Sequence, residues 1–212
     1  MDLIMKIDYL PFEKSGIEQL PIVDADLWLY QQVELGQSYG ELLSELIDNT
    51  EWRQEEITIY GKTHLQPRLT AWYGNQESSY SYSGITMEPR PWNQILLNLK
   101  ARIESLLGQD FNSVLLNYYR DHRDSMGMHS DDEPELGKQP VIASLSLGEE
   151  RTLLLRHKYR KDLSTIKLSL TSGSLLVMKG STQSYWKHGI GKQKQPCGSR
   201  LNLTFRSIIG SQ

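Results

Sequence analysis

Residues 117–133 read NYYRDHRDSMGMHSDDE, and the rest of the chain can be interpreted around the His129-Ser-Asp131 sequence near the end of this segment. In an extended segment, side chains at positions i and i+2 point to the same face. The imidazole of His129 and the carboxylate of Asp131 can therefore bind one metal ion. Alone, such a three-residue pattern is weak, because most cases are a surface histidine beside a solvated acid.

A second histidine, His188, follows near the end of a later predicted strand. Two histidines and one carboxylate make the facial triad of non-haem Fe(II) oxygenases. Three protein ligands leave three coordination positions open, two for a chelating cosubstrate and one for dioxygen. Zinc accepts the same ligands, so the residue types alone leave the metal undecided.

Four polar side chains share one face of the strand predicted at 199–207: Arg200, Asn202, Thr204 and Arg206. An edge strand with its polar face in water would explain them. If that face instead lines the interior, the buried guanidinium groups need anions. A dicarboxylate cosubstrate meets this need, because arginine binds carboxylates through two parallel hydrogen bonds. Asn117 and Tyr119, also at i and i+2, could donate to the same ligand.

The composition is that of an ordinary globular protein, with 212 residues of which 38% are hydrophobic and 23% charged. We expect one domain, with or without an extension, and a monomer. No apolar run is long enough for a membrane span, and the first ten residues lack a signal-peptide pattern. The single cysteine fits a reducing compartment, so the cytoplasm, or the nucleus in a eukaryote, is expected.

Charge is distributed unevenly along the chain. Residues 151–212 contain 12 Lys and Arg and one acid, whereas residues 1–150 contain 11 Lys and Arg and 25 acids. The basic part favours a polyanionic partner such as nucleic acid. The alternative is that its strands keep solvated Lys and Arg on their outer faces.

Residues 1–56 are interpreted as an acidic extension packed on the core, with helices near 25–31, capped by Asp24, and at 40–48. Strands are predicted at 57–60, 69–73 and 78–83, and a helix at 91–107 that ends at Gly108. Eight further strands are predicted at 112–119, 126–131, 141–147, 151–157, 166–170, 174–178, 183–188 and 199–207. A mainly β fold with flanking helices follows, with a jelly-roll core at about 112–209 inside a domain of residues 57–212.

Several motifs in a fixed order resemble those of the AlkB family of Fe(II)/2-oxoglutarate-dependent dioxygenases, in the branch that repairs alkylated DNA. The resemblance runs from about residue 60 to residue 209. It includes Pro67-Arg68, Tyr80-Ser-Tyr82-Ser-Gly84, Asn117-Tyr-Tyr119, His129-Ser-Asp131-Asp-Glu133, Ala143-Ser-Leu-Ser-Leu-Gly148, Gly173-Ser-Leu-Leu-Val-Met178, His188 and Arg200-x-Asn202-Leu-Thr-x-Arg206.

The resemblance implies a double-stranded β-helix, in agreement with the independent strand count. It implies Fe(II) ligation by His129, Asp131 and His188. Arg200, helped by Tyr119, would bind the distal carboxylate of 2-oxoglutarate. Residues near the cosubstrate would further include Asn117, Asn202 and Arg206.

The implied reaction uses dioxygen and 2-oxoglutarate to hydroxylate the N-methyl group of 1-methyladenine or 3-methylcytosine, releasing succinate, CO2 and formaldehyde. Such bases are positively charged, and Tyr80 or Tyr82 could stack on them while Glu133 or Asp132 supplies an anion. A base in duplex DNA must be flipped out to react. Tyr60 is the candidate for a finger residue that fills the gap.

Two other interpretations remain open at the level of sequence. The first is the same chemistry on RNA or on a protein side chain. The second is a jelly-roll protein that binds metal or ligand without turnover; Arg200, Arg206 and the complete triad argue against it.

Overall fold

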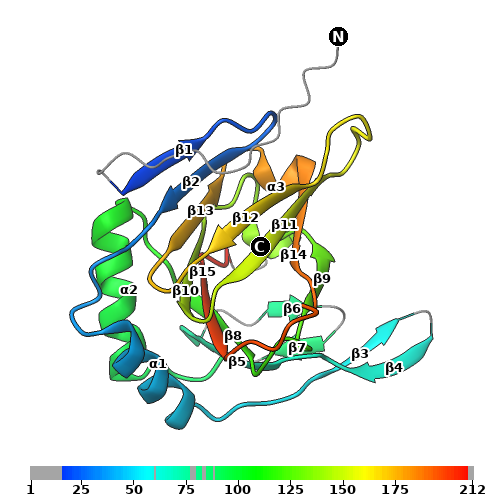
Figure 1. Ribbon diagram of the computed structural model, residues 1–212. Helices are drawn as coiled ribbons and strands as arrows, with labels where there is room; N and C mark the ends of the chain where they lie inside the picture. Colours follow the sequence, from blue (N-terminus) through cyan, green and yellow to red (C-terminus); the bar gives the residue numbers. More distant parts are fainter. Residues whose placement is uncertain (1–15, 60, 77–79, 83–84, 88, 210–212) are drawn as a thin grey trace.

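The computed structural model describes residues 16–59, 61–76, 80–82, 85–87 and 89–209, with only the backbone of 58–59, 80–82 and 85–87 (Figure 1). The helices are α1 (Tyr39–Asp48), α2 (Gln94–Leu107), the short α3 (Thr182–Tyr185) and the 3-10 turn η1 (Pro134–Leu136). The strands are β1 (Ile17–Leu20), β2 (Asp26–Tyr30), β3 (Glu56–Ile59), β4 (Lys62–Leu65), β5 (Leu69–Gly74), β6 (Tyr80–Tyr82), β7 (Ile85–Met87), β8 (Ser113–Tyr119), β9 (Met126–His129), β10 (Ile142–Gly148), β11 (Arg151–His157), β12 (Ile166–Leu170), β13 (Leu175–Lys179), β14 (Trp186–Ile190) and β15 (Arg200–Arg206).

Two antiparallel sheets form the body of the protein. The major sheet has the order β1-β2-β13-β10-β15-β8-β5, and the minor sheet has the order β12-β11-β14-β9. From β8 to β15 the chain passes back and forth between the two sheets, except that β11 and β12 form a hairpin within the minor sheet, and this arrangement is a double-stranded β-helix. The predicted jelly-roll fold is therefore confirmed. Seven of its eight strands lie close to their predicted places, and the strand predicted at 183–188 begins later, after α3.

The helix predicted at 25–31 is wrong, because residues 26–30 form β2, which pairs with β13 in the major sheet. The segment Asp-Leu-Trp-Leu-Tyr alternates with period two, and both of its faces are apolar. Leu27 and Leu29 pack into the core between the sheets, while Trp28 and Tyr30 pack toward the helices. A run that is apolar on both faces hides the alternation that marks a strand.

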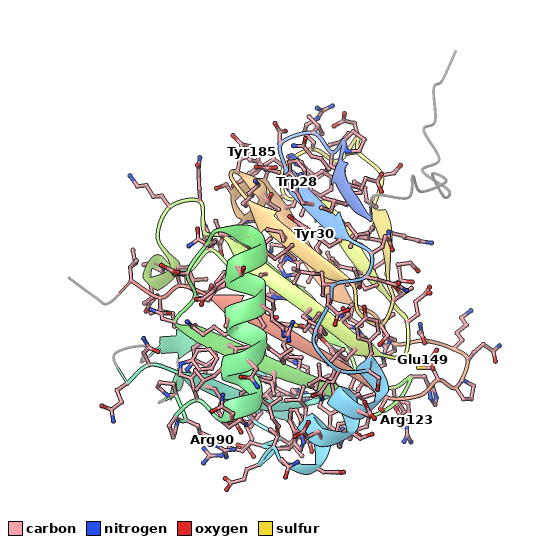
Figure 2. All side chains as sticks on the ribbon, turned by 90° about the vertical axis from the view of Figure 1, so that its left-hand side faces the viewer. Trp28, Tyr30, Arg90, Arg123, Glu149 and Tyr185 are labelled. Atoms are coloured by element: carbon pink, nitrogen blue, oxygen red, sulfur yellow. The ribbon has the colours of Figure 1, made fainter. Side chains whose placement is uncertain are left out.

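Helices α1 and α2 cover the outer face of the major sheet (Figure 1). Figure 2 shows α2 crossing the strands, with Trp28 and Tyr30 of β2 beside it. Asn93 caps the start of α2 by accepting a hydrogen bond from the backbone N–H of Leu96 at 2.9 Å. Gly108 ends the helix at φ 62°, as predicted. Leu106, in the last turn of α2, is 44% exposed.

Two hairpins lie outside the main sheets: β3 with β4, and β6 with β7. The β3–β4 hairpin projects from the body of the molecule in Figure 1, and all four residues of β4 are exposed. Tyr60, predicted as the duplex finger, lies outside the described residues. Within the described part of the chain, no helix is both long enough and apolar enough to cross a membrane.

The last strand, β15, has one face toward the core beneath the helices and the other toward the space between the two sheets. All seven of its residues are buried. Its apolar residues point into the core beneath the helices, whereas the alternate polar residues line a cavity between the sheets. The explanation of β15 as a solvated edge strand is thereby excluded.

Candidate metal and cosubstrate site

Three side chains that could hold a metal ion meet where β9 pairs with β14 in the minor sheet. His129, the last residue of β9, lies directly opposite His188 of β14, and their ring centroids are 4.3 Å apart. Asp131 follows two residues after His129. One potential ligand atom from each residue lies within 4.8 Å of the others. The pairing of β9 with β14 thus brings His129 and His188 together, although they are 59 positions apart in the sequence.

The carboxylate of Asp131 is held on one side and open on the other. Arg206 donates from Nη2 to Asp131 Oδ1 at 2.6 Å, and the Asp131 backbone N–H donates to Gln183 Oε1 at 2.9 Å. Oδ2 is buried and has no hydrogen-bond partner among the described residues; His188 Nε2 is 3.6 Å away. Burial alone would raise the pKa of Asp131, but the charge of Arg206 and the two histidines lower it to about 2. An ionised, buried oxygen without a partner fits a metal cation.

Both histidines are suited to metal binding. Burial lowers the pKa of His188 to about 3, with a further contribution from His129, so its ring is neutral at physiological pH. His129 Nδ1 lies 2.9 Å from the carbonyl oxygen of Gly127. When Nδ1–H donates to that oxygen, the lone pair of Nε2 is left for a metal. The donor set of two imidazole nitrogens and one carboxylate oxygen fits Fe(II).

Arg200 provides an anion site across the cavity from the triad. Its side chain is 2% exposed, and its Nη2 donates to Ser146 Oγ at 2.9 Å. Nε and Nη1 are buried without a partner among the described residues. Burial lowers the pKa of the Arg200 guanidinium, as expected for a cation taken out of water. The remaining N–H groups fit a carboxylate that would complete the set of hydrogen bonds.

Hydrogen bonds fix the polar side chains that β8, β10 and β15 direct into the cavity. Arg68 Nε donates to Asn117 Oδ1 at 2.7 Å. Asn202 Nδ2 donates to Ser144 Oγ at 2.8 Å, and Thr204 Oγ1 donates to Asn202 Oδ1 at 2.9 Å. These bonds hold the side chains in one arrangement before any ligand enters.

One cavity joins all eight residues predicted for the metal and the cosubstrate. They line it together with Met126, Ser144, Leu153, Leu170, Leu176, Met178, Gly189, Ile190 and Thr204. The apolar residues come mainly from the minor sheet and from β13, and the polar ones other than the triad come from β8, β10 and β15. The cavity therefore has a metal-binding end, an arginine end and an apolar wall.

The four residues predicted to bind a substrate base differ in whether their side chains are described and in what those side chains contact. Asp132 accepts from Lys158 Nζ at 2.7 Å, so its carboxylate is already paired. Glu133 Oε2 is buried and has no hydrogen-bond partner among the described residues. Tyr80 and Tyr82 lie at the two ends of β6, which pairs with β7, but their side chains are outside the described part. Glu133 therefore offers the better anion.

Sequence reasoning missed several residues that organise the site. Ser144 and Ser146 belong to a family motif, and Ala143-Ser-Leu-Ser-Leu147 also shows the same polar alternation as the last strand, which is the signal that could have identified them. Gln183, which accepts from the Asp131 backbone, had no visible signal because its contact depends on the position of α3. Arg151 was counted among residues for a polyanionic partner, but it is 1% exposed.

Comparison with known proteins agrees with this geometry. The family model described as the 2OG-Fe(II) oxygenase superfamily matches residues 28–206. DNA oxidative demethylase ALKBH2 of Mus musculus is 36% identical over 187 residues, which cover 85% of this chain and 78% of that protein. The chain belongs to the AlkB family of 2OG-Fe(II) oxygenases.

Another member of the family is more similar in sequence. Alpha-ketoglutarate-dependent dioxygenase alkB homolog 3 of Homo sapiens is 45% identical over 175 residues, covering 79% of this chain and 60% of that protein. The chain thus spans about 60% of the length of this relative. The solved structure of OsALKBH1 superposes with a TM-score of 0.61 at 18% identity, covering 90% of this chain and 99% of that one. This likeness supports the fold.

Proposed function

We propose that this AlkB-family protein is an Fe(II)- and 2-oxoglutarate-dependent dioxygenase that removes N-methyl groups from alkylated bases in DNA. The observation that carries the proposal is that one cavity holds two groups. The first is a triad of the half-buried His129 and the buried Asp131 and His188, with an Asp131 oxygen that has no hydrogen-bond partner among the described residues. The second is the buried Arg200, whose Nε and Nη1 have no such partner either. A cation and an anion are both needed to satisfy the two groups. Fe(II) and 2-oxoglutarate supply them together.

The roles of the site residues follow from their contacts. His129, Asp131 and His188 would hold Fe(II), with Arg206 fixing the carboxylate so that Oδ2 is directed to the metal. Arg200 would hold the distal carboxylate of 2-oxoglutarate. When bound, Fe(II) couples the oxidative decarboxylation of 2-oxoglutarate by dioxygen to hydroxylation of an N-methyl group, which then leaves as formaldehyde.

The remaining polar side chains of the cavity orient the cosubstrate. Asn117 and Asn202 are both held by neighbours, Arg68 and Ser144, so their positions are fixed before binding. Tyr119 packs beside the Arg200 guanidinium, with the arginine Cζ 5.2 Å from the ring centroid. Such a preorganised set reduces the loss of conformational entropy when the ligand binds.

For a cationic methylated base, Glu133 would be the candidate counterion, four residues after His129. The buried Oε2 of Glu133 has no partner among the described residues and would attract the positive charge of 1-methyladenine or 3-methylcytosine. Tyr80 and Tyr82 would supply stacking surfaces on the β6–β7 hairpin. Relatives bearing the name DNA oxidative demethylase support DNA as the substrate.

Basic residues outside the cavity support a nucleic-acid partner. Of the 12 Lys and Arg in residues 151–212, Arg151, Arg200 and Arg206 are buried and unavailable to phosphates. On the outer face of the minor sheet, Arg156 of β11 lies directly opposite Lys187 of β14, and both are exposed. Like charges opposite each other in a sheet are destabilising, and a polyanion would relieve the repulsion.

We propose that the protein acts as a monomer in the cytoplasm, or in the nucleus of a eukaryote.

Repair assays on matched oligonucleotides test this function. Single-stranded DNA, duplex DNA and RNA, each with one 1-methyladenine or 3-methylcytosine, are incubated with protein, Fe(II) and 2-oxoglutarate, and the bases are quantified. We expect loss of the methylated base from DNA. Repair of RNA alone would move the function to RNA, and no repair of any of the three would contradict the proposal.

The same assay tests whether Tyr60 fills the gap that a flipped base leaves in duplex DNA. Tyr60 falls between the paired strands β3 and β4 in the sequence, and Tyr60→Ala should slow repair of duplex more than repair of single strands. Tyr82→Ala should slow both, because base stacking is worth roughly 1–3 kcal/mol in either substrate. Equal losses on the two substrates for Tyr60→Ala would remove Tyr60 from this role.

A further inference from the structure

Arg151, the first residue of β11, is buried as deeply as Arg200, with exposures of 1% and 2%. It is not among the residues that line the cavity. Its strand places it on the inner face with Leu153 and Leu155, where an arginine is rarely found without an anionic partner. Because Arg151 does not line the cavity, direct contact with a ligand does not explain why its guanidinium is buried.

The hydrogen bonds of Arg151 join two segments that carry the metal-binding residues. Nη1 donates to the carbonyl oxygen of Asp121 at 3.2 Å, and Nη2 donates to those of Asp124 at 2.9 Å and Gly191 at 2.7 Å. Residues 121 and 124 lie just before β9, which ends at His129, and Gly191 directly follows β14, which contains His188. Arg151 therefore ties together the ends of both strands.

The charge of Arg151 has no counterion among the described side chains. Its three acceptors are all uncharged carbonyls, and its Nε is buried without a partner there. The carboxylates of Asp121 and Asp124 are engaged by Arg123 and Arg120, respectively. A positive charge thus stays uncompensated in the interior, which costs free energy unless an anion binds nearby.

Tyr119 lies beside both buried arginines. The Cζ atom of Arg151 is 5.6 Å from the centroid of its ring, and that of Arg200 is 5.2 Å away. The ring is 1% exposed and also lines the cavity. After burial, the charge of Arg151 is a further cause that lowers the pKa of Arg200, so the two guanidinium groups are electrostatically coupled.

We propose that Arg151 acts from behind Tyr119 as a positioning residue that makes the cavity selective for a 2-oxo acid with a second, distal carboxylate. It holds the Tyr119 ring beside Arg200, and it adds positive charge near that carboxylate. The inference rests on the proposed function, because the ligand is taken to be 2-oxoglutarate. Arg151 itself touches neither the metal nor the ligand.

The experiment compares two ligands that share the metal-chelating end. 2-Oxoglutarate has a distal carboxylate and pyruvate has none, and the dissociation constant of each is measured by calorimetry on full-length protein loaded with Mn(II). For Arg151→Gln we expect 2-oxoglutarate to bind about tenfold more weakly or worse, since tenfold corresponds to about 1.4 kcal/mol of lost interaction. Pyruvate binding should change less than about twofold, because its affinity does not depend on charge at the arginine end.

Arg151→Lys keeps the charge but cannot donate to all three carbonyls from one planar group. Its preference for 2-oxoglutarate over pyruvate should lie between those of the wild type and Arg151→Gln, and this variant carries the test if Arg151→Gln does not fold. Arg102→Gln, which removes an exposed arginine from α2, is the control and should leave both constants unchanged.

Two results would overturn the inference. Unchanged preference in both Arg151 variants would show that the charge and the Tyr119 contact do not reach the ligand. Equal weakening of both ligands would show a general structural role. Wild-type protein that does not bind 2-oxoglutarate at all would instead contradict the proposed function, so the two failures are distinguishable.

Discussion

At the scale of single residues, the candidate site holds a buried carboxylate and a buried guanidinium whose hydrogen bonds are incomplete among the described residues. Asp131 has one oxygen bound to Arg206 and one without a partner among the described residues, and Arg200 has one nitrogen bound and two without. Unsatisfied buried polar groups are expensive. Their concentration in one cavity is the physical signature of a binding site rather than of a structural core.

Asp131→Asn tests the metal site at this scale. The amide keeps an oxygen to accept from Arg206, whereas Asp131→Ala would break this buried ion pair and cost roughly 3–5 kcal/mol of stability. We expect Asp131→Asn to fold and to bind Mn(II) more than about 100-fold more weakly, beyond the 10–100-fold cost of losing an outer-shell partner. Calorimetric titration measures the affinity. Wild-type affinity in this variant would place the metal elsewhere.

Arg200→Ala tests the anion site. It removes a cavity-lining guanidinium whose Nε and Nη1 have no hydrogen-bond partner among the described residues. Truncating one partner of a buried charged pair costs about 2–5 kcal/mol, so the affinity for 2-oxoglutarate should fall steeply. The apparent KM for 2-oxoglutarate, measured at saturating Fe(II), checks this. Ser146→Ala, which removes the hydroxyl that accepts from Arg200 but keeps the guanidinium, should weaken 2-oxoglutarate binding less than Arg200→Ala does.

At the scale of elements, the close pairing of β9 with β14 sets the distance between the two histidines. A Cβ added to Gly189, the residue after His188, would lie 2.8 Å from the carbonyl oxygen of Met126 and 3.0 Å from that of Gly127. Both contacts are with backbone atoms of β9, which can move away only as a strand. Glycine is thus required where the backbones approach closely.

Gly189→Ala should push β9 away and misplace His129 relative to His188. We expect Mn(II) affinity to fall by about tenfold or more, since displacements on the order of 1 Å at a site are costly. Gly191→Ala is the matched control, because a Cβ there meets only Leu154 Cδ1 at 3.8 Å, an ordinary contact. Equal affinity in the two variants would show that the strand spacing tolerates the methyl group.

Much of the element scale could be predicted from the sequence. The alternation in β15 predicted its polar face, and the i, i+2 spacing of His129 and Asp131 predicted that both side chains lie in one candidate metal site. The helix predicted at 25–31 was wrong because β2 is apolar on both faces, so local periodicity could not distinguish it. The contacts of Gln183 and Arg151 also could not be predicted, because they join residues brought together only by the sheet order. The boundary at residue 56 stays a prediction, although β2 belongs to the same sheet as β8 and β15.

At the scale of the whole molecule, the basic outer face of the minor sheet would contact phosphates. Arg156→Gln with Lys187→Gln removes an exposed like-charge pair, so the fold should be as stable as the wild type or slightly more stable. Binding to single-stranded DNA should weaken, and the slope of log affinity against log salt should become shallower by about 1.4, or about 0.7 per contact. Fluorescence anisotropy at several salt concentrations measures this. An unchanged slope would direct the search for phosphate contacts to the other basic residues.

We propose above all that the triad and Arg200 act together to couple the oxidation of 2-oxoglutarate to demethylation of the base. The amounts of the two products test this most directly. Succinate and formaldehyde are quantified after incubation of the full chain with Fe(II), 2-oxoglutarate and a 3-methylcytosine oligonucleotide, in parallel with Asp131→Asn. We predict about one formaldehyde for each succinate in the wild type, with neither product above background in the variant or without 2-oxoglutarate. Formaldehyde formed at the wild-type rate by Asp131→Asn, or none formed by wild-type protein shown to bind both Fe(II) and 2-oxoglutarate, would contradict the claim.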